Sequence, residues 1–270
     1  MKTTTAINHL FLLLMGLLVS CVSPVDSPNA TATLTVFAAA SLAEPFEEIG
    51  RAFEARPENA GVAVAFSFAG SQQLARQINE GAPADVFAAA NPEQMDVVAA
   101  EGRVDASGVR IFAENRLVVI VPEDNLAGIN ALEVLARPGL KLVLAAEEVP
   151  AGRYSLEFLR KASADPQFSE TYEAEVLANV VSYEENVRAV LTKVQLGEAD
   201  AGVVYATDAA AGGKVGVIEI PQALNVAARY PIAVVSGSQN EEVAKRFVEF
   251  VMSQEAQDIL SGYGFVQIKQ

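Results

Sequence analysis

The sequence has few of the side chains that enzymes use for acid–base or nucleophilic chemistry. Its 270 residues include one histidine, His9, one cysteine, Cys21, and no tryptophan. His9 lies in an N-terminal segment that we expect to be removed on export, so the mature chain would contain no histidine. This excludes a Ser-His-Asp triad, a histidine-bound zinc ion and a histidine general base. The patterns Gly-x-x-x-x-Gly-Lys-Ser/Thr and Gly-x-Gly-x-x-Gly are also absent, which leaves no nucleotide-binding motif.

Basic residues are scarce as well. The chain has 19 Lys and Arg against 34 Asp and Glu, which gives a formal net charge of -15. Nucleic acid is therefore not an expected partner, because binding its phosphates requires basic patches. The same charge repels free anions, although salt screens this field over about 8–10 Å. A site for an anion in this chain must work through local dipoles.

The N-terminus has the pattern of an export signal, which we place at residues 1–20. Lys2 supplies a positive charge, and residues 10–19 form an apolar run that is too short to span a bilayer. The run ends in Leu18-Val19-Ser20-Cys21, which resembles a bacterial lipoprotein box, with cleavage before Cys21 and lipidation of its thiol. An ordinary signal peptide with an incidental cysteine is the alternative. If Cys21 is lipidated, residues 21–32 form a lipid-bearing, flexible tether rich in proline and small polar residues.

Strand-like and helix-like runs alternate after the tether. Leu42, Phe46, Ile49 and Phe53 recur at helical spacing behind a β-branched and aromatic run at 34–38. We expect further strands at 62–68, 85–89, 117–121, 141–145, 201–205, 215–220 and 232–235, and further helices at 72–79, 92–100, 152–162, 187–194, 243–251 and 254–260. This alternation predicts an α/β fold of mainly parallel sheets covered by helices, with ligands bound beyond the carboxyl ends of strands.

Two serines follow predicted strands at the points where helices begin. Ser41 follows the run VFAAA at 36–40, and Ser71 follows the run FSFAG at 66–70. A helix start exposes free backbone N–H groups and the positive end of the helix dipole, and a hydroxyl adds one more donor. Two such ends that converge would bind an anion without a charged side chain. The alternative is helix capping alone, and residues 41–44 have the Ser-x-x-Glu form of a capping box.

Several short motifs, taken together and in order, match a known family. They are VFAAASL (36–42), LARQI (74–78), GAPADVF (81–87), VPAG (149–152), EENVR (184–188), GVVYATDA (202–209), YPIAVV (230–235) and YGF (263–265). From Leu34 to Ile268 the chain resembles the bacterial molybdate-binding proteins, the type II periplasmic solute receptors of ABC importers. The resemblance implies two lobes, each a mainly parallel sheet flanked by helices, joined by crossing hinge strands.

The resemblance also implies a ligand site made of neutral hydrogen-bond donors. The hydroxyl and backbone N–H of Ser41 and Ser71 would hold the anion from one lobe, and the N–H groups of Ala151 and Val187 and the phenol of Tyr205 from the other. On sequence alone, Tyr205 is equally well explained as a core tyrosine. The implied ligand is molybdate or tungstate, with no cofactor and no metal other than that of the oxyanion.

Three further positions lie near this predicted site. Gly70 departs from the family, in which many relatives carry serine at this place. Arg153 and Arg188 lie close to predicted contacts, but the family pattern does not use them as ligands, so we expect both to be surface residues.

We expect one lobe at 33–113 plus 231–270 and the other at 114–230, with crossings near 114–117 and 228–231. The receptor would be a monomer in the periplasm or on the outer face of the cell membrane, held at the membrane surface through Cys21. Closed by its ligand, it would dock on a membrane permease. Three alternatives stay open: a receptor for another solute such as sulfate, an exported carboxylate-dependent hydrolase, and a surface lipoprotein with a structural role.

Overall fold

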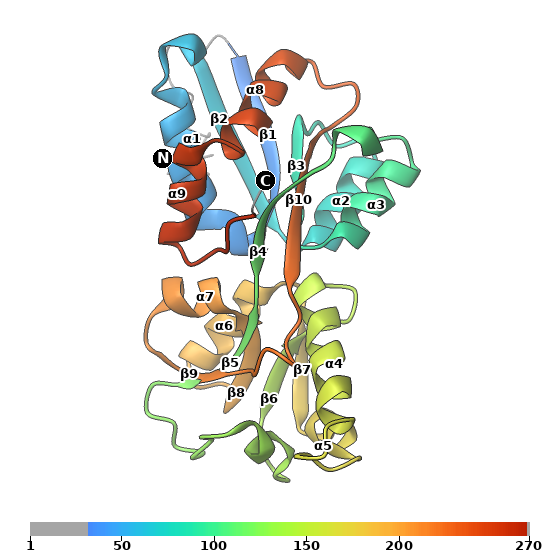
Figure 1. Cartoon of the computed structure of the whole chain (residues 1–270), viewed down its shortest axis with the longest axis vertical. Coiled ribbons are helices and arrows are strands. Elements are labelled where there is room, and N and C mark those ends of the chain that lie inside the picture. Colours follow the sequence, from blue (N-terminus) through green and yellow to red (C-terminus); the bar gives the residue numbers. More distant parts are fainter. Residues whose placement is uncertain (1–31, 269–270) are drawn as a thin grey trace, which may run out of the picture.

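The computed structural model describes residues 32–268 and arranges them in two lobes, one above the other in Figure 1. The predicted signal peptide, Cys21 and all but the last residue of the predicted tether lie outside the described residues. Within 32–268, no helix combines the length and the apolar character that crossing a membrane requires.

The first lobe is built on the sheet β2-β1-β3-β10-β4. Its strands are β1 (Ala32–Ala39), β2 (Val62–Ala69), β3 (Val86–Ala88), β4 (Arg110–Asn115) and β10 (Ala228–Val234). Helices α1 (Ala43–Glu54), α8 (Glu241–Val251) and α9 (Gln254–Gly262) cover one face, and α2 (Ser71–Asn79) and α3 (Pro92–Ala100) cover the other. Along β1, Val36 joins the buried cluster of the first group and Phe37 that of the second, because side chains of a strand alternate between its faces.

The second lobe is built on the sheet β7-β6-β8-β5-β9. Its strands are β5 (Leu117–Pro122), β6 (Leu142–Ala145), β7 (Val180–Glu184), β8 (Ala201–Tyr205) and β9 (Val215–Glu219), and its helices are α4 (Pro150–Ser163), α5 (Tyr172–Ala178), α6 (Val187–Gln195) and α7 (Ala206–Gly212). Gly202 lets α6 approach β8 closely, since a Cβ there would lie 2.8 Å from Cγ1 of Val190. The start of α6 is thereby held at the end of the sheet that faces the other lobe.

Both sheets are mainly parallel, as predicted, with one strand in each that runs against the other four. β10 runs antiparallel to β3 and β4, and β5 runs antiparallel to β8 and β9. The remaining neighbours, such as β1 with β2 and β6 with β8, are parallel. β10 and β5 are the strands that enter a lobe from the other lobe. They start at the cleft, where the other strands end, and must therefore run in the opposite direction.

The chain passes between the lobes at two neighbouring points. Only Arg116 separates β4 from β5, and residues 220–227 connect β9 to β10. Residues 228–231 pair with β4, beginning with Ala228 opposite Asn115, so the two segments expected to cross lie side by side. The residue ranges expected to move as lobes stay a prediction.

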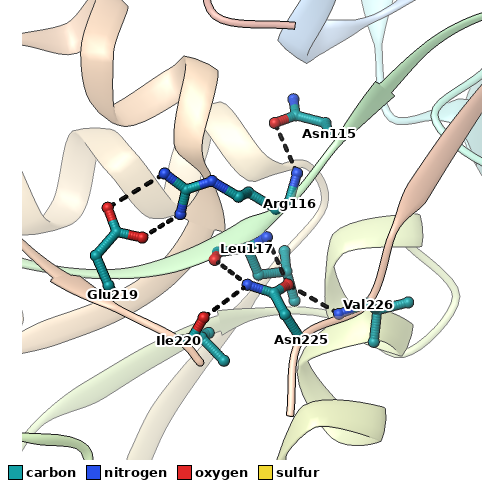
Figure 2. Close-up of polar contacts among 7 residues, drawn as sticks. All are labelled: Asn115, Arg116, Leu117, Glu219, Ile220, Asn225 and Val226. Atoms are coloured by element: carbon teal, nitrogen blue, oxygen red, sulfur yellow. Dashed lines mark hydrogen bonds and ion pairs between the residues drawn. The ribbon is translucent and has the colours of Figure 1, made fainter. Parts of the chain in front are cut away.

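Asn225 joins the two crossings (Figure 2). Its Oδ1 accepts from the N–H of Leu117 at 3.0 Å and of Val226 at 2.8 Å, and its Nδ2 donates to the carbonyls of Leu117 at 2.8 Å and Ile220 at 3.2 Å. Arg116 and Glu219 form an ion pair beside it, with Nη2 donating to Oε1 at 3.2 Å. One side chain thus fixes the separation of the two crossing segments.

The sequence did not predict two strands and two α-helices that the structure contains: β4, β7, α5 and α7. β4 and β7 are edge strands, and β7 alternates only between half-buried and exposed residues, so neither has a continuous apolar run. α5 and α7 have seven residues each, too few for a helical repeat to be visible in sequence. By contrast, α3 and β8 have the predicted bounds.

We expect Asn225→Ala to lower the free energy of unfolding by about 2–3 kcal/mol, because four hydrogen bonds at the crossings are lost. Denaturant unfolding measures this. Gln222→Ala, at an exposed position of the same connection, is the matched control. Equal effects of the two substitutions would contradict the role assigned to Asn225.

Candidate functional site

The five residues predicted to contact a ligand line one cavity between the lobes. It is narrow, with a volume of about 10 Å³, and takes its walls from strand ends and helix starts of both lobes. Besides Ser41, Ser71, Ala151, Val187 and Tyr205, the lining consists of small, apolar or amide residues: Ala39, Ala40, Ala69, Gly70, Ala90, Val149, Pro150 and Asn186. None of these side chains is charged. Their role as ligand contacts stays a prediction.

The two serines do not cap helices, so the capping alternative is wrong for both. Ser41 lies inside the 3₁₀ helix Ala40–Leu42 that precedes α1, and Leu42, at the N-cap of α1, makes no side-chain capping bond. The Oγ of Ser41 lies 2.9 Å from the phenol oxygen of Tyr230, a buried residue of β10. Ser71 is the first residue of α2, and Gly70 occupies the N-cap.

Ser71 keeps its donors available to the cavity. Its Oγ accepts from the backbone N–H of Ala90 at 3.0 Å, which leaves its own O–H proton for another acceptor. Gly70 N–H donates to Oε1 of Gln73 at 3.2 Å, and Gln73 N–H donates to the carbonyl of Gly70 at 2.9 Å. Since the first N–H groups of a helix have no partner inside it, those of Ser71 and Gln72 are the ones left at this end.

Two helices of the second lobe begin at the same cavity. Ala151 is the second residue of α4, directly after Pro150, and is buried. Gly152 allows this helix start to approach the end of β6, because a Cβ there would lie 2.0 Å from the carbonyl oxygen of Ala146. Val187 is the first residue of α6, and the Oδ1 of its N-cap residue, Asn186, accepts from Ala189 N–H at 3.0 Å. This cap uses the third N–H group of the helix and leaves that of Val187.

Tyr205 ends β8 with its hydroxyl buried. The residue is 1% exposed, and its phenol oxygen has no hydrogen-bond partner anywhere in residues 32–268. Burial, followed by the neighbouring phenol of Tyr230, raises the pKa of Tyr205 well above its ordinary value. The group therefore remains a donor at neutral pH. A buried donor without a partner is costly, so its position in this cavity favours a ligand that accepts hydrogen bonds.

The arrangement suits a fully ionised anion. The starts of α2, α4 and α6 bring the positive ends of their dipoles to one cavity, with hydroxyl groups from both lobes between them. No carboxylate lines the cavity to accept a proton from a protonated ligand. Among residues 32–268, no group of three or more His, Cys, Asp or Glu could hold a metal ion.

The prediction that Arg188 is a surface residue is wrong. Arg153 is exposed, as expected, but Arg188 is only 24% exposed and forms two ion pairs. Its Nη1 donates to Oε1 of Glu44 at 2.9 Å, its Nη2 contacts Oε2 of Glu44, and its Nε lies 2.6 Å from Oδ1 of Asp208. Glu44 is on α1 of the first lobe, and the other two are on α6 and α7 of the second.

Burial dominates the titration of Asp208, which is completely inaccessible to solvent. It raises the pKa of Asp208 from its ordinary value of 3.8 to about 7. The Arg188 guanidinium opposes this rise, the carboxylate of Glu44 adds to it, and the backbone N–H of Tyr205 lowers it again. One guanidinium between two carboxylates thus only partly offsets the cost of burying one of them.

Tyr230 and Asp208 were not among the predicted site residues. Both lie in motifs of the family resemblance, but their partners, Ser41 and Arg188, come from distant parts of the chain. Asn186 had a local signature, an asparagine directly before an apolar helical stripe, and could have been found as a cap.

We expect Asp208 to make stability depend on pH. Because its pKa is raised in the folded state, the stability it contributes is fully present below about pH 4 and is lost as the pH rises to about 7. The melting temperature of the unmodified protein minus that of Asp208→Asn should therefore fall over this range and level off above it. A difference that grows with pH would mean that attraction to Arg188 outweighs burial.

Comparisons with known proteins agree with this fold. The model of the family described as bacterial extracellular solute-binding protein matches residues 34–266. The molybdate-binding protein ModA of Mycobacterium tuberculosis H37Rv is 38% identical over 246 residues, covering 91% of this chain and 88% of that protein. The putative ABC transporter substrate-binding lipoprotein YvgL of Bacillus subtilis is 30% identical, covering 86% of each chain.

A solved structure with the same fold is the sulfate-binding protein SubI of M. tuberculosis. It superposes with a TM-score of 0.78 at 21% identity and covers 88% of each chain. At this identity the likeness concerns the fold alone. Because the family model spans most of the sequence and the relatives are covered almost end to end, this chain belongs to the bacterial extracellular solute-binding proteins.

Proposed function

We propose that this protein is a receptor that captures molybdate, and also tungstate, outside the cytoplasm and delivers it to an ABC importer. The observation that carries the proposal is the buried, unpartnered hydroxyl of Tyr205 in a cavity that has helix starts on both sides and no charged side chain. The relative from M. tuberculosis, named as a molybdate-binding protein, supports the choice of anion.

In this proposal, Ser41 and Ser71 donate to the oxyanion from the first lobe, and Ala151, Val187 and Tyr205 donate from the second. Molybdate and tungstate are tetrahedral dianions without a proton at neutral pH, so a lining of donors satisfies all four oxygens. Phosphate is partly protonated and would bring a donor of its own into a cavity without a carboxylate to accept it. Phosphate should therefore bind more weakly.

Sulfate is the second candidate, because it is also a bare dianion and a sulfate-binding protein shares the fold. Its hydrogen-bonding needs are the same, so only the size of the closed cavity can separate it from molybdate. Donors spaced for the larger ion leave sulfate with stretched bonds. Each hydrogen bond to a charged group contributes about 1.5–3 kcal/mol, so several stretched bonds together produce strong discrimination.

The mechanism follows from the position of the donors. Since they come from two lobes, the anion draws 33–113 plus 231–270 toward 114–230, and the crossings act as the hinge. We propose binding without catalysis, because the lining supplies donors but no base to activate its hydroxyl groups as nucleophiles. A lipid on Cys21 would keep the monomeric receptor near its permease, and the lipoprotein named among the relatives supports this.

We expect molybdate to raise the melting temperature by about 5–10 °C when free ligand is about 100-fold above its Kd. Tungstate should act similarly, and equimolar sulfate and phosphate much less. Differential scanning calorimetry on the purified chain measures all four ions. Equal shifts with sulfate and molybdate would contradict the proposed selectivity, and no shift with any of them would overturn the proposed function.

We expect Tyr205→Phe to weaken molybdate binding by about 1–3 kcal/mol, because one donor to the anion is lost. The ligand-free protein should be no less stable, since the hydroxyl has no partner in residues 32–268 to lose. Tyr183→Phe, at a tyrosine 55% exposed on β7, is the control. Isothermal titration and thermal unfolding give the two readouts. A loss of ligand-free stability with unchanged affinity would instead assign Tyr205 to the core.

A further inference from the structure

Three charged side chains connect the lobes beside the cavity, and we call them the interlobe triad: Glu44, Arg188 and Asp208. Glu44 receives two contacts from one guanidinium, through Nη1 at 2.9 Å and through Nη2. The third nitrogen, Nε, lies 2.6 Å from Oδ1 of Asp208 and forms an ion pair with it that lacks hydrogen-bond geometry. The Glu44 contact has the parallel, two-pronged geometry in which arginine–carboxylate pairs are strongest and most directional.

Each member of the triad stands within one helical turn of a predicted anion contact. Arg188 directly follows Val187, Glu44 is three residues after Ser41, and Asp208 is three residues after Tyr205. Arg188 shares α6 with Val187, whereas Glu44 and Asp208 lie in the first turns of α1 and α7, directly behind Ser41 and Tyr205, so each side chain is close along the chain to the backbone that faces the cavity. Any motion that moves the donors toward an anion also moves the triad together.

The three residues of the interlobe triad differ in burial, and we infer a different role for each from this difference. Side-chain exposure is 0% for Asp208, 24% for Arg188 and 42% for Glu44. Asp208 and Arg188 share a lobe, so their pair persists whether the lobes are apart or together. Glu44 is the member that can withdraw into solvent, and it does so only if the first lobe moves away.

Every charged or titratable group that faces Asp208 is consistent with these roles. Arg188 approaches from α6 and Glu44 from α1, while the phenols of Tyr205 on β8 and Tyr230 on β10 lie close enough to interact with it. Arg188 is the one cation in this group, so Asp208 holds the guanidinium in place and leaves its outer edge directed at the opposite lobe.

A second set of contacts flanks the cavity from α2. Nε2 of Gln72 donates to the backbone carbonyl of Glu185 at 2.8 Å, and Nε2 of Gln73 donates to its Oε2 at 2.9 Å. Gly70 permits this approach, since a Cβ there would lie 2.5 Å from the same carbonyl oxygen. These contacts align the lobes through the amides of two glutamines, whereas the triad adds a pairing of opposite charges.

We propose that the interlobe triad is a latch that forms when the lobes close and that slows the release of the bound anion. Asp208 acts as a positioning residue for Arg188, and Glu44 closes the latch from the other lobe. The inference rests on the proposed function, because it assumes that an anion drives closure.

For the loss of the Glu44 carboxylate, the latch and simple charge repulsion predict opposite changes in anion affinity. A carboxylate near the site repels a dianion, so removing it without further effect would strengthen binding. If Glu44 is a latch, its removal instead weakens binding. Glu47→Gln is the matched control, because Glu47 is on the same helix, is exposed, and loses the same charge.

The experiment measures association and dissociation rates of molybdate by stopped flow for the unmodified chain, Glu44→Gln and Glu47→Gln. We expect Glu44→Gln to release molybdate about tenfold faster, with an association rate within about twofold, because loss of one partner of an interface charge pair acts mainly on dissociation. Glu47→Gln should release it at the unmodified rate. The melting temperature of the ligand-free protein should be the same for both variants.

Asp208→Asn, made in the unmodified chain and in the Glu44→Gln variant, tests whether Asp208 positions Arg188. Alone it should speed release, and combined with Glu44→Gln it should add nothing further, since both act through Arg188. Additive effects would overturn the role given to Asp208.

Equal release from Glu44→Gln and Glu47→Gln, or slower release from Glu44→Gln, would overturn the latch while leaving the proposed function intact. If the unmodified chain does not bind molybdate, the proposed function is wrong. The latch is then tested by the same rates with tungstate and sulfate, and failure of all three to bind would overturn both.

Discussion

The structure depends on one constraint, which is that the first backbone N–H groups of a helix have no partner within the helix. Three helix starts and the buried hydroxyl of Tyr205 meet at a single cavity between two lobes. In a chain with a net charge of -15, these dipoles provide attraction for an anion without a lysine or arginine in the lining. The parallel strands of each sheet meet this requirement, because strands that end at the cleft place the next helix start there.

Much of the fold could be predicted from local patterns. Strand β8 is an uninterrupted apolar run, and helix α3 begins at Pro92 after the N-cap Asn91, and the bounds of both match the prediction. Strand direction could not be read in this way. Whether β5 and β10 run parallel or antiparallel to their neighbours depends on the side from which the chain enters the lobe, which no local pattern records.

The candidate site shows the same division between local and distant information. The serines stand at the ends of β1 and β2 as expected, but their hydroxyls bond elsewhere than to their own helices. Ser41 bonds to Tyr230, 189 residues away, and Arg188 pairs with Glu44 across 144 residues. A capping box and a solvated arginine were reasonable expectations from the sequence, because the partners that replace them become neighbours only when the two lobes are assembled.

The central claim is that a molybdate ion occupies the cavity between the lobes. Crystals grown with sodium molybdate and measured at the molybdenum absorption edge test it directly, since the anomalous signal locates the metal without reference to the protein. We expect one strong peak within hydrogen-bonding reach, through its oxygens, of Ser41, Ser71, Ala151, Val187 and Tyr205. A fully occupied peak elsewhere, or a cavity without anomalous signal in crystals that contain molybdate, would contradict the account.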